Sequence, residues 1–285
     1  MQNMQNMQNM RKFLVFQLYG PLASWGEVAV GGERPVAPHP GRSAILGMLA
    51  AAAGIRRDQE EQHQVLEQAF GMAVRMETAG TLLHDYHTVQ VPPQAALKKH
   101  PAITRRDELS ALAAYQQDNP KTSGTILSNR AYRCDALYQI ALWKRQDSSL
   151  TLEQAKEYLN CPNFTLCLGR KSCPPALPLQ AHIVKAATLV DAFLAAECIS
   201  LQEFLEILGM KGVDLNKGRC AALFWDGDSV ESGIPARETF IRRDAVLSRQ
   251  RWQFEERREH HAPWPQQPQQ LQQPQTLQQP QQEET

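Results

Sequence analysis

The sequence predicts an α+β fold, with one folded domain built on a small antiparallel sheet. Segments with strand and helix patterns follow one another irregularly along the 285 residues and are too sparse for repeated βαβ units. A long polar interval separates the early elements from the later strands. The apolar content of 42% is enough for a core, and no run approaches the roughly 18 apolar residues of a membrane helix. These observations exclude a doubly wound sheet and a transmembrane protein.

Glycines divide the first half of the chain into its expected elements. An apolar run from Phe13 stops at Gly20-Pro21, as expected of a strand followed by a turn. Ala, Leu and Met fill the segment between Ser43, a possible N-cap, and Gly54, which indicates a helix. We expect a strand over 12–18, a helix over 43–55, a helix over 64–70 and a strand over 73–78.

The second half of the chain repeats this mixture with longer gaps. Its strongest strand pattern begins at Ala136 and its clearest helical spacing at Leu152. We expect a strand over 136–143, a helix over 152–159, a strand over 183–187 and a helix over 201–208. From Arg237 to Arg258, arginines and acidic residues balance each other, so we expect a salt-bridged surface there.

Both ends of the chain have low-complexity compositions. Residues 1–9 are three copies of Met-Gln-Asn, and residues 262–285 are almost entirely Gln and Pro. Such segments bury too little apolar area to offset the entropy of ordering them. We therefore expect a disordered leader over 1–9, a folded domain over 10–261 and a disordered tail over 262–285.

Charge and cysteine content place few limits on the function. Lys and Arg total 30, and so do Asp and Glu, so the net charge says nothing about the partners. The six cysteines include no C-x-x-C pair and lack histidines at zinc-finger spacing, which favours free thiols in a reducing cytoplasm. Neither a phosphate-binding Walker loop nor a dinucleotide fingerprint is present. We expect no metal, no cofactor, no membrane contact and a cytoplasmic location.

The first candidate site is the glycine-rich stretch from Gly20 to Arg42. Its glycines let a ligand approach the backbone, Trp25 offers a stacking face, and Arg34 and Arg42 reach phosphates. A helix that opens at Ser43 adds free backbone N–H groups beside Arg42, which form an anion site. The alternative is that the glycines only turn the chain and Trp25 fills the core.

The second candidate is the segment from His84 to Thr88 with the polar interval 90–129 that follows it. This interval looks like a protruding arm that lies along a phosphate backbone, and a plain solvated loop is the alternative. His87, with Tyr86 and Lys98, is a candidate for metal-free RNA cleavage through proton transfer, or a merely structural histidine. The basic side chains of the interval are Lys98, Lys99, His100, Arg105, Arg106 and Lys121.

Two further candidates lie around the later strands. Arg130 and Tyr132 are two residues apart and share one face of a strand, where they would offer a cation and an aromatic plate. An ordinary exposed edge is the alternative. A glycine turn with adjacent cations resembles a phosphate-gripping loop, although so short a motif also arises by chance. That turn consists of Gly169, Arg170, Lys171 and Ser172.

Five motifs occur together, in order, between about Met10 and Phe254. They are G-P-L-x-S-W-G at Gly20, Arg34-Pro35 leading to Ser43, D-Y-H-T-V at Asp85, R-x-Y-x-C-D-A at Arg130 and L-G-R-K-S-C-P at Leu168. Taken together they resemble the Cas-five subunits of type I-E CRISPR Cascade, in the RAMP superfamily. The resemblance implies a modified ferredoxin-like (RRM-like) fold with a protruding thumb hairpin, here at about 88–129.

The resemblance also implies a role. Such a subunit is non-catalytic, grips the 5′ handle of CRISPR RNA, contacts the backbone subunit CasC and the large subunit CasA, and meets target DNA through the assembled complex. Two alternatives stay open: a metal-independent precursor-RNA endonuclease that uses His87, Tyr86 and Lys98, and an interaction module without RNA. The residues expected at the RNA are Trp25, Gly26, Arg34, Arg42, Ser43, His87, Lys98, Lys99, Arg105, Arg106, Arg130, Tyr132, Gly169, Arg170, Lys171 and Ser172.

Overall fold

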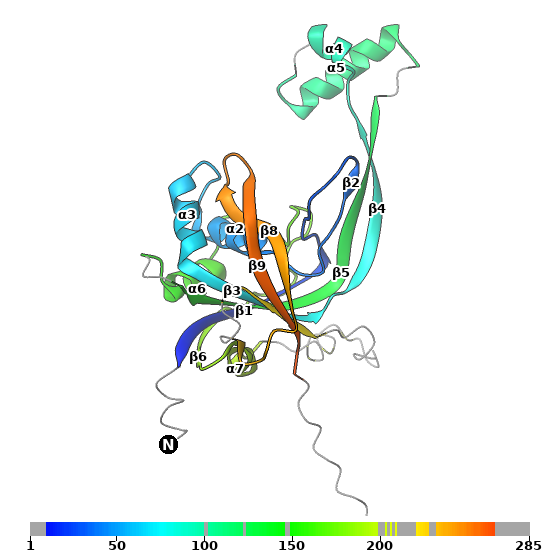
Figure 1. The fold of residues 1–285 in the computed structure, drawn as a ribbon. Coiled ribbons are helices and arrows are strands. Elements are labelled where there is room, and N and C mark those ends of the chain that lie inside the picture. The colour runs from blue at the N-terminus through cyan, green and yellow to red at the C-terminus, as the bar shows by residue number, and fades with distance from the viewer. Residues whose placement is uncertain are drawn as a thin grey trace, which may run out of the picture.

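The computed structural model contains one mixed sheet with helices on both of its faces (Figure 1). It describes residues 10–99, 102–121, 124–145, 149–198, 203, 206, 209, 221–227 and 232–265. The expected leader, most of the expected tail and most of the expected helix over 201–208 lie outside this part of the chain. Within it, no helix is long and apolar enough to cross a membrane.

Within the described residues, nine strands form a single sheet. Its main path runs β6-β1-β5-β3-β7-β9-β8, and β2 and β4 both pair with β5 off this path. Every pairing is antiparallel except that of β2 with β5. The strands are β1 (Arg11–Ala23), β2 (Glu33–Arg34), β3 (Phe70–Thr78), β4 (Thr81–Gln90), β5 (Thr125–Lys144), β6 (His182–Ala186), β7 (Ala222–Trp225), β8 (Glu238–Ser248) and β9 (Gln253–Pro263).

The helices cover the sheet unequally. The described helices are α2 (Arg42–Ala53), α3 (Glu60–Ala69), α4 (Gln94–Lys99), α5 (Arg105–Asp118), α6 (Leu152–Asn160) and α7 (Leu189–Ala195). Residues of α2, α3 and α6 share one core cluster with Leu14 and Phe16 of β1, whereas α7 packs with Phe13 and Val15 on the opposite face. Because alternate strand residues face opposite sides, the unbroken apolar run of β1 supplies both cores.

Strand β5 joins the core sheet to a projecting arm. Its C-terminal half pairs with β1 and β3, while its N-terminal half pairs with β4 from Cys134 to Thr125. The β4–β5 ribbon therefore leaves the sheet and carries α4 and α5 at its far end (Figure 1). Helix α5 starts with a capping box between Thr104 and Asp107, which explains why this polar segment is helical.

The Arg-rich segment forms the β8–β9 hairpin, which rises on the same side of the sheet as α2 and α3 (Figure 1). The ion pairs expected there are present, but several are buried: Arg257 lies 2.6 Å from both Asp244 and Glu259, and Glu259 is only 2% exposed. The hairpin is therefore part of the interior as well as the surface.

The folded part of the chain extends past residue 261. Ala262 is buried, and the ring of Trp264 lies 6.0 Å from that of Phe193, edge to face. The guanidinium of Arg75 lies 4.0 Å from the centre of the Trp264 ring. The expected boundary at 262 is wrong for these first residues, because one tryptophan in a Gln/Pro-rich stretch has enough apolar surface to pack against the core.

Candidate nucleic-acid interface

Arg130 lies where three strands meet. Its backbone pairs with Arg34 of β2 on one side and with Asp85 of β4 on the other. Paired residues on neighbouring strands lie about 5 Å apart and point to the same face of the sheet. The half-buried Arg130 and the exposed Arg34 therefore present two cations side by side, and Asp85 lies on the other side of Arg130, on β4.

The loop that carries Arg34 is tightly wound. The Arg34 side chain donates hydrogen bonds through Nη1 to the carbonyls of Gly31, at 2.6 Å, and Glu33, at 2.9 Å. Gly31 has a φ of 61°, and a Cβ at that position would meet no atom within 4 Å. Gly26 is exposed, pairs with Val36 and is equally uncrowded. The sequence-predicted open, glycine-rich surface is thus present around Arg34.

The second basic element is the loop from Leu168 to Cys173. Its ends are joined by a hydrogen bond from the Leu168 N–H to the Cys173 carbonyl, at 2.7 Å, and it docks on Ser24, the residue that follows β1. Gly169 has a φ of 91°, and a Cβ there would lie 1.9 Å from the Ser24 carbonyl oxygen. Only glycine satisfies both conditions, so the Gly in this motif is a structural requirement.

Arg170 is positioned by β5. Its guanidinium carbon lies 4.6 Å from the centre of the Tyr132 ring, and Nη1 donates to the Ala131 carbonyl at 3.5 Å. Tyr132 is itself 8% exposed and belongs to the main core. The expectation that Tyr132 stacks on a base is therefore wrong, because Arg170 occupies the face of the ring. Lys171 and Ser172 are exposed to solvent.

Two other expected contacts lie in the interior. Trp25 is 1% exposed and packs edge to face on Tyr138, with ring centres 5.8 Å apart. Arg42 is also 1% exposed, with Nη1 2.6 Å from Asp226 Oδ2 and Nη2 2.8 Å from the Phe70 carbonyl oxygen. Neither side chain is available to RNA, so the alternative that Trp25 fills the core holds.

The expected anion site at the start of α2 is filled by the protein itself. Asp244 Oδ2 accepts a hydrogen bond from the Arg42 backbone N–H at 2.8 Å. The Ser43 side chain does not cap the helix, and the Ser43 carbonyl accepts a hydrogen bond from Arg249. A carboxylate from the β8–β9 hairpin thus takes the position that a phosphate would occupy.

The segment from His84 to Thr88 lies within β4, along the projecting ribbon. His87 Nδ1 is 3.8 Å from Asp85 Oδ2, and both side chains are partly exposed. Tyr86 and His87 are adjacent in a strand and so point to opposite faces of the ribbon, while Lys98 lies on α4 beyond its end. The three residues of the endonuclease alternative are therefore not brought together.

The basic residues of the arm have different environments. Arg105 binds Glu108 Oε2 and the Gln90 carbonyl oxygen, both at 2.6 Å, and so ties α5 to the ribbon. Arg106 and Lys98 are exposed on the two helices. The side chain of Lys99 and all of His100 lie outside the described residues.

Two comparisons with known sequences give matches that cover more than half of the chain. A family model described as "CRISPR-associated protein (Cas_Cas5)" matches residues 13–258. The CRISPR system Cascade subunit CasD of Escherichia coli (strain K12) is 32% identical over 193 residues, which cover 65% of this chain and 77% of that protein.

Solved structures match over most of the chain. A chain of a "CRISPR RNA-guided surveillance complex" aligns with a TM-score of 0.54 and 21% identity, covering 88% of this chain and 90% of its own length. A structure titled "Crystal structure of Cas protein" aligns with a TM-score of 0.49 and 22% identity, over 89% and 95%. The first match and the described architecture confirm the expected fold class, an α+β domain of the modified ferredoxin-like type with a protruding hairpin.

Proposed function

This chain belongs to the CRISPR-associated Cas5 family, and from that premise we propose that it is a non-catalytic subunit of a type I-E Cascade surveillance complex. In this role it binds the 5′ handle of the CRISPR RNA and contacts the backbone subunit CasC and the large subunit CasA. It meets target DNA through the assembled complex and acts in the cytoplasm. The identity to a relative named as a Cascade subunit supports this assignment.

The RNA-binding part of the proposal rests on the pairing of Arg34 with Arg130 in neighbouring strands. Next to them lies Arg170, whose guanidinium stacks on the Tyr132 ring. Guanidinium groups bind phosphate through two parallel hydrogen bonds, and their orientation is fixed here by strand pairing and by stacking. A phosphodiester backbone that follows β5 would meet these three cations in turn. The handle-binding residues proposed are Gly26, Arg34, His87, Arg130, Gly169, Arg170, Lys171 and Ser172.

The projecting ribbon is proposed as the thumb that lies along the RNA and the neighbouring CasC subunit. Lys98, Lys99, Arg105 and Arg106 would carry the positive charge at its end, over about residues 88–129. A net charge of zero is compatible with this role, because local patches and neighbouring subunits supply the cations that the whole chain lacks.

The proposed lack of catalysis is supported by the positions of the residues that would perform it. Proton transfer needs an acid and a base within reach of one substrate atom. Tyr86 and His87 point to opposite faces of β4, and Lys98 lies on a different element. Their arrangement does not form such a pair.

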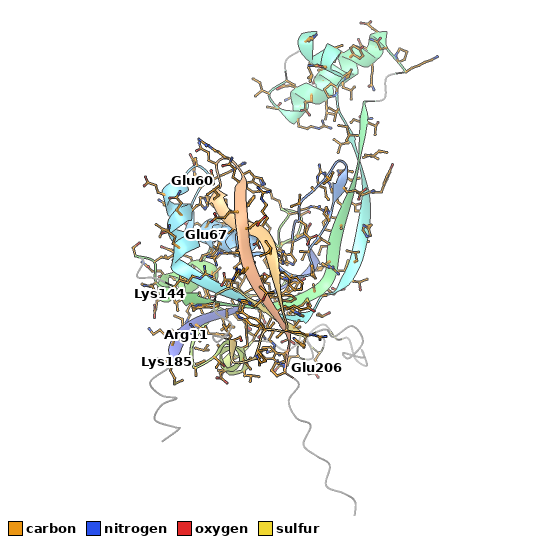
Figure 2. All side chains as sticks on the ribbon, in the orientation of Figure 1. Arg11, Glu60, Glu67, Lys144, Lys185 and Glu206 are labelled. Carbon is orange, nitrogen blue, oxygen red and sulfur yellow. The ribbon has the colours of Figure 1, made fainter. Side chains whose placement is uncertain are left out.

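The test is co-expression of the chain with the other Cascade subunits and a CRISPR RNA, followed by purification and quantification of the bound RNA. Arg130→Ala is expected to lower the RNA retained at moderate salt and to reduce the salt concentration at which RNA dissociates. Lys185→Ala is the matched control, because Lys185 is an exposed cation on the distant edge strand β6 (Figure 2). Equal RNA content and salt sensitivity in both variants would contradict the assignment.

A further inference from the structure

The turn between β8 and β9 holds a tryptophan at the surface in a strained conformation. Trp252 is 58% exposed, and its φ of 57° lies in the left-handed region that bulky residues rarely adopt. Backbone strain of this kind is concentrated at functional sites, where the surrounding structure enforces it. Trp252 is not among the expected site residues, and its only signal in the sequence is a tryptophan beside arginines.

Two arginines fix the orientation of the indole. The guanidinium carbons of Arg57 and Arg249 lie 4.8 Å and 5.8 Å from the centre of the Trp252 ring. Arg57 Nε donates a hydrogen bond to the Arg249 carbonyl at 3.0 Å, which links the segment between α2 and α3 to the turn. Phe254 packs edge to face on the indole, at 5.6 Å. The exposed ring is therefore held in place before any ligand arrives.

Glu60 fixes the backbone of the same turn. Its carboxylate accepts hydrogen bonds from the Ser248 hydroxyl at 3.2 Å, the Arg249 N–H at 3.2 Å and the Gln250 N–H at 3.1 Å. Figure 2 shows Glu60 on α3 beside the top of the β8–β9 hairpin. The turn is thus anchored to the body of the protein, although it projects from it.

The surroundings of Trp252 are positive and polar. Segments 56–60 and 249–253 together contain four arginines and two acids, in a chain whose net charge is zero. One of the acids, Glu60, already accepts hydrogen bonds from the turn. The exposed residues in these two segments include two arginines and two glutamines that are near Arg57 or Trp252 in the sequence, which are Arg56, Arg251, Gln250 and Gln253.

We propose that this hairpin tip, defined by Trp252, Arg57, Arg56 and Arg251, binds single-stranded nucleic acid. An unpaired base stacks on the exposed indole, and the adjoining phosphates meet the guanidinium groups of Arg251 and Arg56. The surplus of positive charge and the flanking amides favour this ligand over an apolar protein surface. The site is separate from the Arg130 region, because it lies on the β8–β9 hairpin and not on the β4–β5 ribbon (Figure 1).

Fluorescence anisotropy with the full chain tests this site, with labelled oligo(dT) and oligo(U) of about 15 nucleotides as probes. Trp252→Ala is expected to weaken binding by about tenfold, and Trp252→Phe to keep most of the affinity, because a phenyl ring still stacks. Ile241→Ala is the matched control, since Ile241 is a 62% exposed apolar residue on the same hairpin, and it is expected to bind as the original chain does. An equal loss of affinity for both probes would show that the site binds single-stranded DNA and RNA alike. A loss for one probe would identify that kind of nucleic acid as the ligand.

Trp252→Gly separates binding from folding. Glycine adopts a positive φ without strain, so this variant is expected to keep the melting temperature of the original chain and still lose affinity. Lack of binding by the original chain, or equal affinities of the original chain and Trp252→Ala, would overturn the hairpin-tip site. Oligonucleotide binding that depends on Arg130 but not on Trp252 would overturn it while leaving the proposed handle-binding function intact.

Discussion

Asp244 Oδ2 accepts a hydrogen bond from the backbone N–H of Arg42 at 2.8 Å, although 202 residues separate the two. Helix α2 begins after Gly41, which has no side chain to cap it, and the distant carboxylate takes the place of a local N-cap. A Cβ at Gly41 would lie 2.4 Å from the same oxygen, so the glycine makes room for it. The β8–β9 hairpin is thereby locked onto the start of α2.

Removal of this carboxylate is expected to destabilise the whole domain. Asp244→Ala leaves the α2 N-terminus uncapped and deprives the largely buried Arg257 of a partner at 2.6 Å, so we expect a loss of about 3 kcal/mol in the free energy of unfolding. Urea unfolding followed by circular dichroism measures it. Glu153→Ala, which breaks the exposed Lys12–Glu153 pair, is the control and should cause little change. Similar unfolding curves for the two variants would contradict the locking role of Asp244.

The elements that were predicted from the sequence are those whose apolar residues face a core. Strand β1 and the C-terminal half of β5 have long apolar runs, so their patterns are visible. Strand β4 and the N-terminal half of β5 form a ribbon that is largely exposed on both faces, and such strands have no apolar alternation. The sequence of the β8–β9 hairpin is typical of a surface, because charged residues such as Glu259 are buried only through distant partners; His39 Nε2 lies 3.4 Å from Glu259 Oε2.

The candidate site was predicted in part for a related reason. Arginine and tryptophan are suited both to RNA contacts and to a core, and only the tertiary partners decide between the two. Arg42 is buried because Asp226, 184 residues away, pairs with it. Arg34 and Arg130 stay near the surface because β2 is short and joins the outer part of β5. No local sequence pattern distinguishes the buried Arg42 from Arg34 and Arg130, which stay near the surface.

The end of the folded chain gives a second prediction. Truncation after Pro265 should leave the melting temperature unchanged, because it removes only Gln/Pro-rich sequence. Truncation after His261 also removes the buried Ala262 and the Trp264 ring that packs on Phe193 and Arg75. We expect this second variant to lose roughly 3 kcal/mol of stability in urea unfolding. Two truncations of equal stability would show that the residues after 261 do not contribute.

Glu259 gives the domain an acid-sensitive contact. Burial raises the pKa of its carboxyl, but the hydrogen bond and charge of His39 and the charges of Arg257 and Arg242 outweigh burial and hold the pKa well below its ordinary value of 4.5. A carboxylate with a lowered folded-state pKa stabilises the fold above its unfolded-state pKa, and this contribution is lost as pH falls through the folded value. The free energy of unfolding should therefore decrease below about pH 4.5. The decrease should be shallower in Glu259→Gln, and equal slopes in both chains would refute this origin.

The loop of Arg170 allows a test in which two glycines are compared. Gly169→Ala places a Cβ against the Ser24 carbonyl oxygen at a φ of 91°, and we expect a loss of about 2 kcal/mol together with weaker RNA retention, since Arg170 is displaced. Gly31→Ala also has a positive φ, but its Cβ meets open space, so it should cost about 1 kcal/mol. Thermal unfolding and RNA content are measured on both. A smaller effect at Gly169 than at Gly31 would contradict the crowded docking of this loop.

The last prediction concerns cleavage. End-labelled CRISPR repeat RNA incubated with the purified chain in EDTA should remain intact on a denaturing gel, because the side chains of Tyr86 and His87 point to opposite faces of β4 and Lys98 lies on α4. His87→Ala should give the same gel. A specific cut that disappears in His87→Ala would establish an endonuclease, and would require the ribbon to rearrange until His87 and a second proton donor reach one phosphodiester. A cut that persists in His87→Ala would instead point to a contaminating nuclease, which a preparation of the Lys185→Ala chain would show equally.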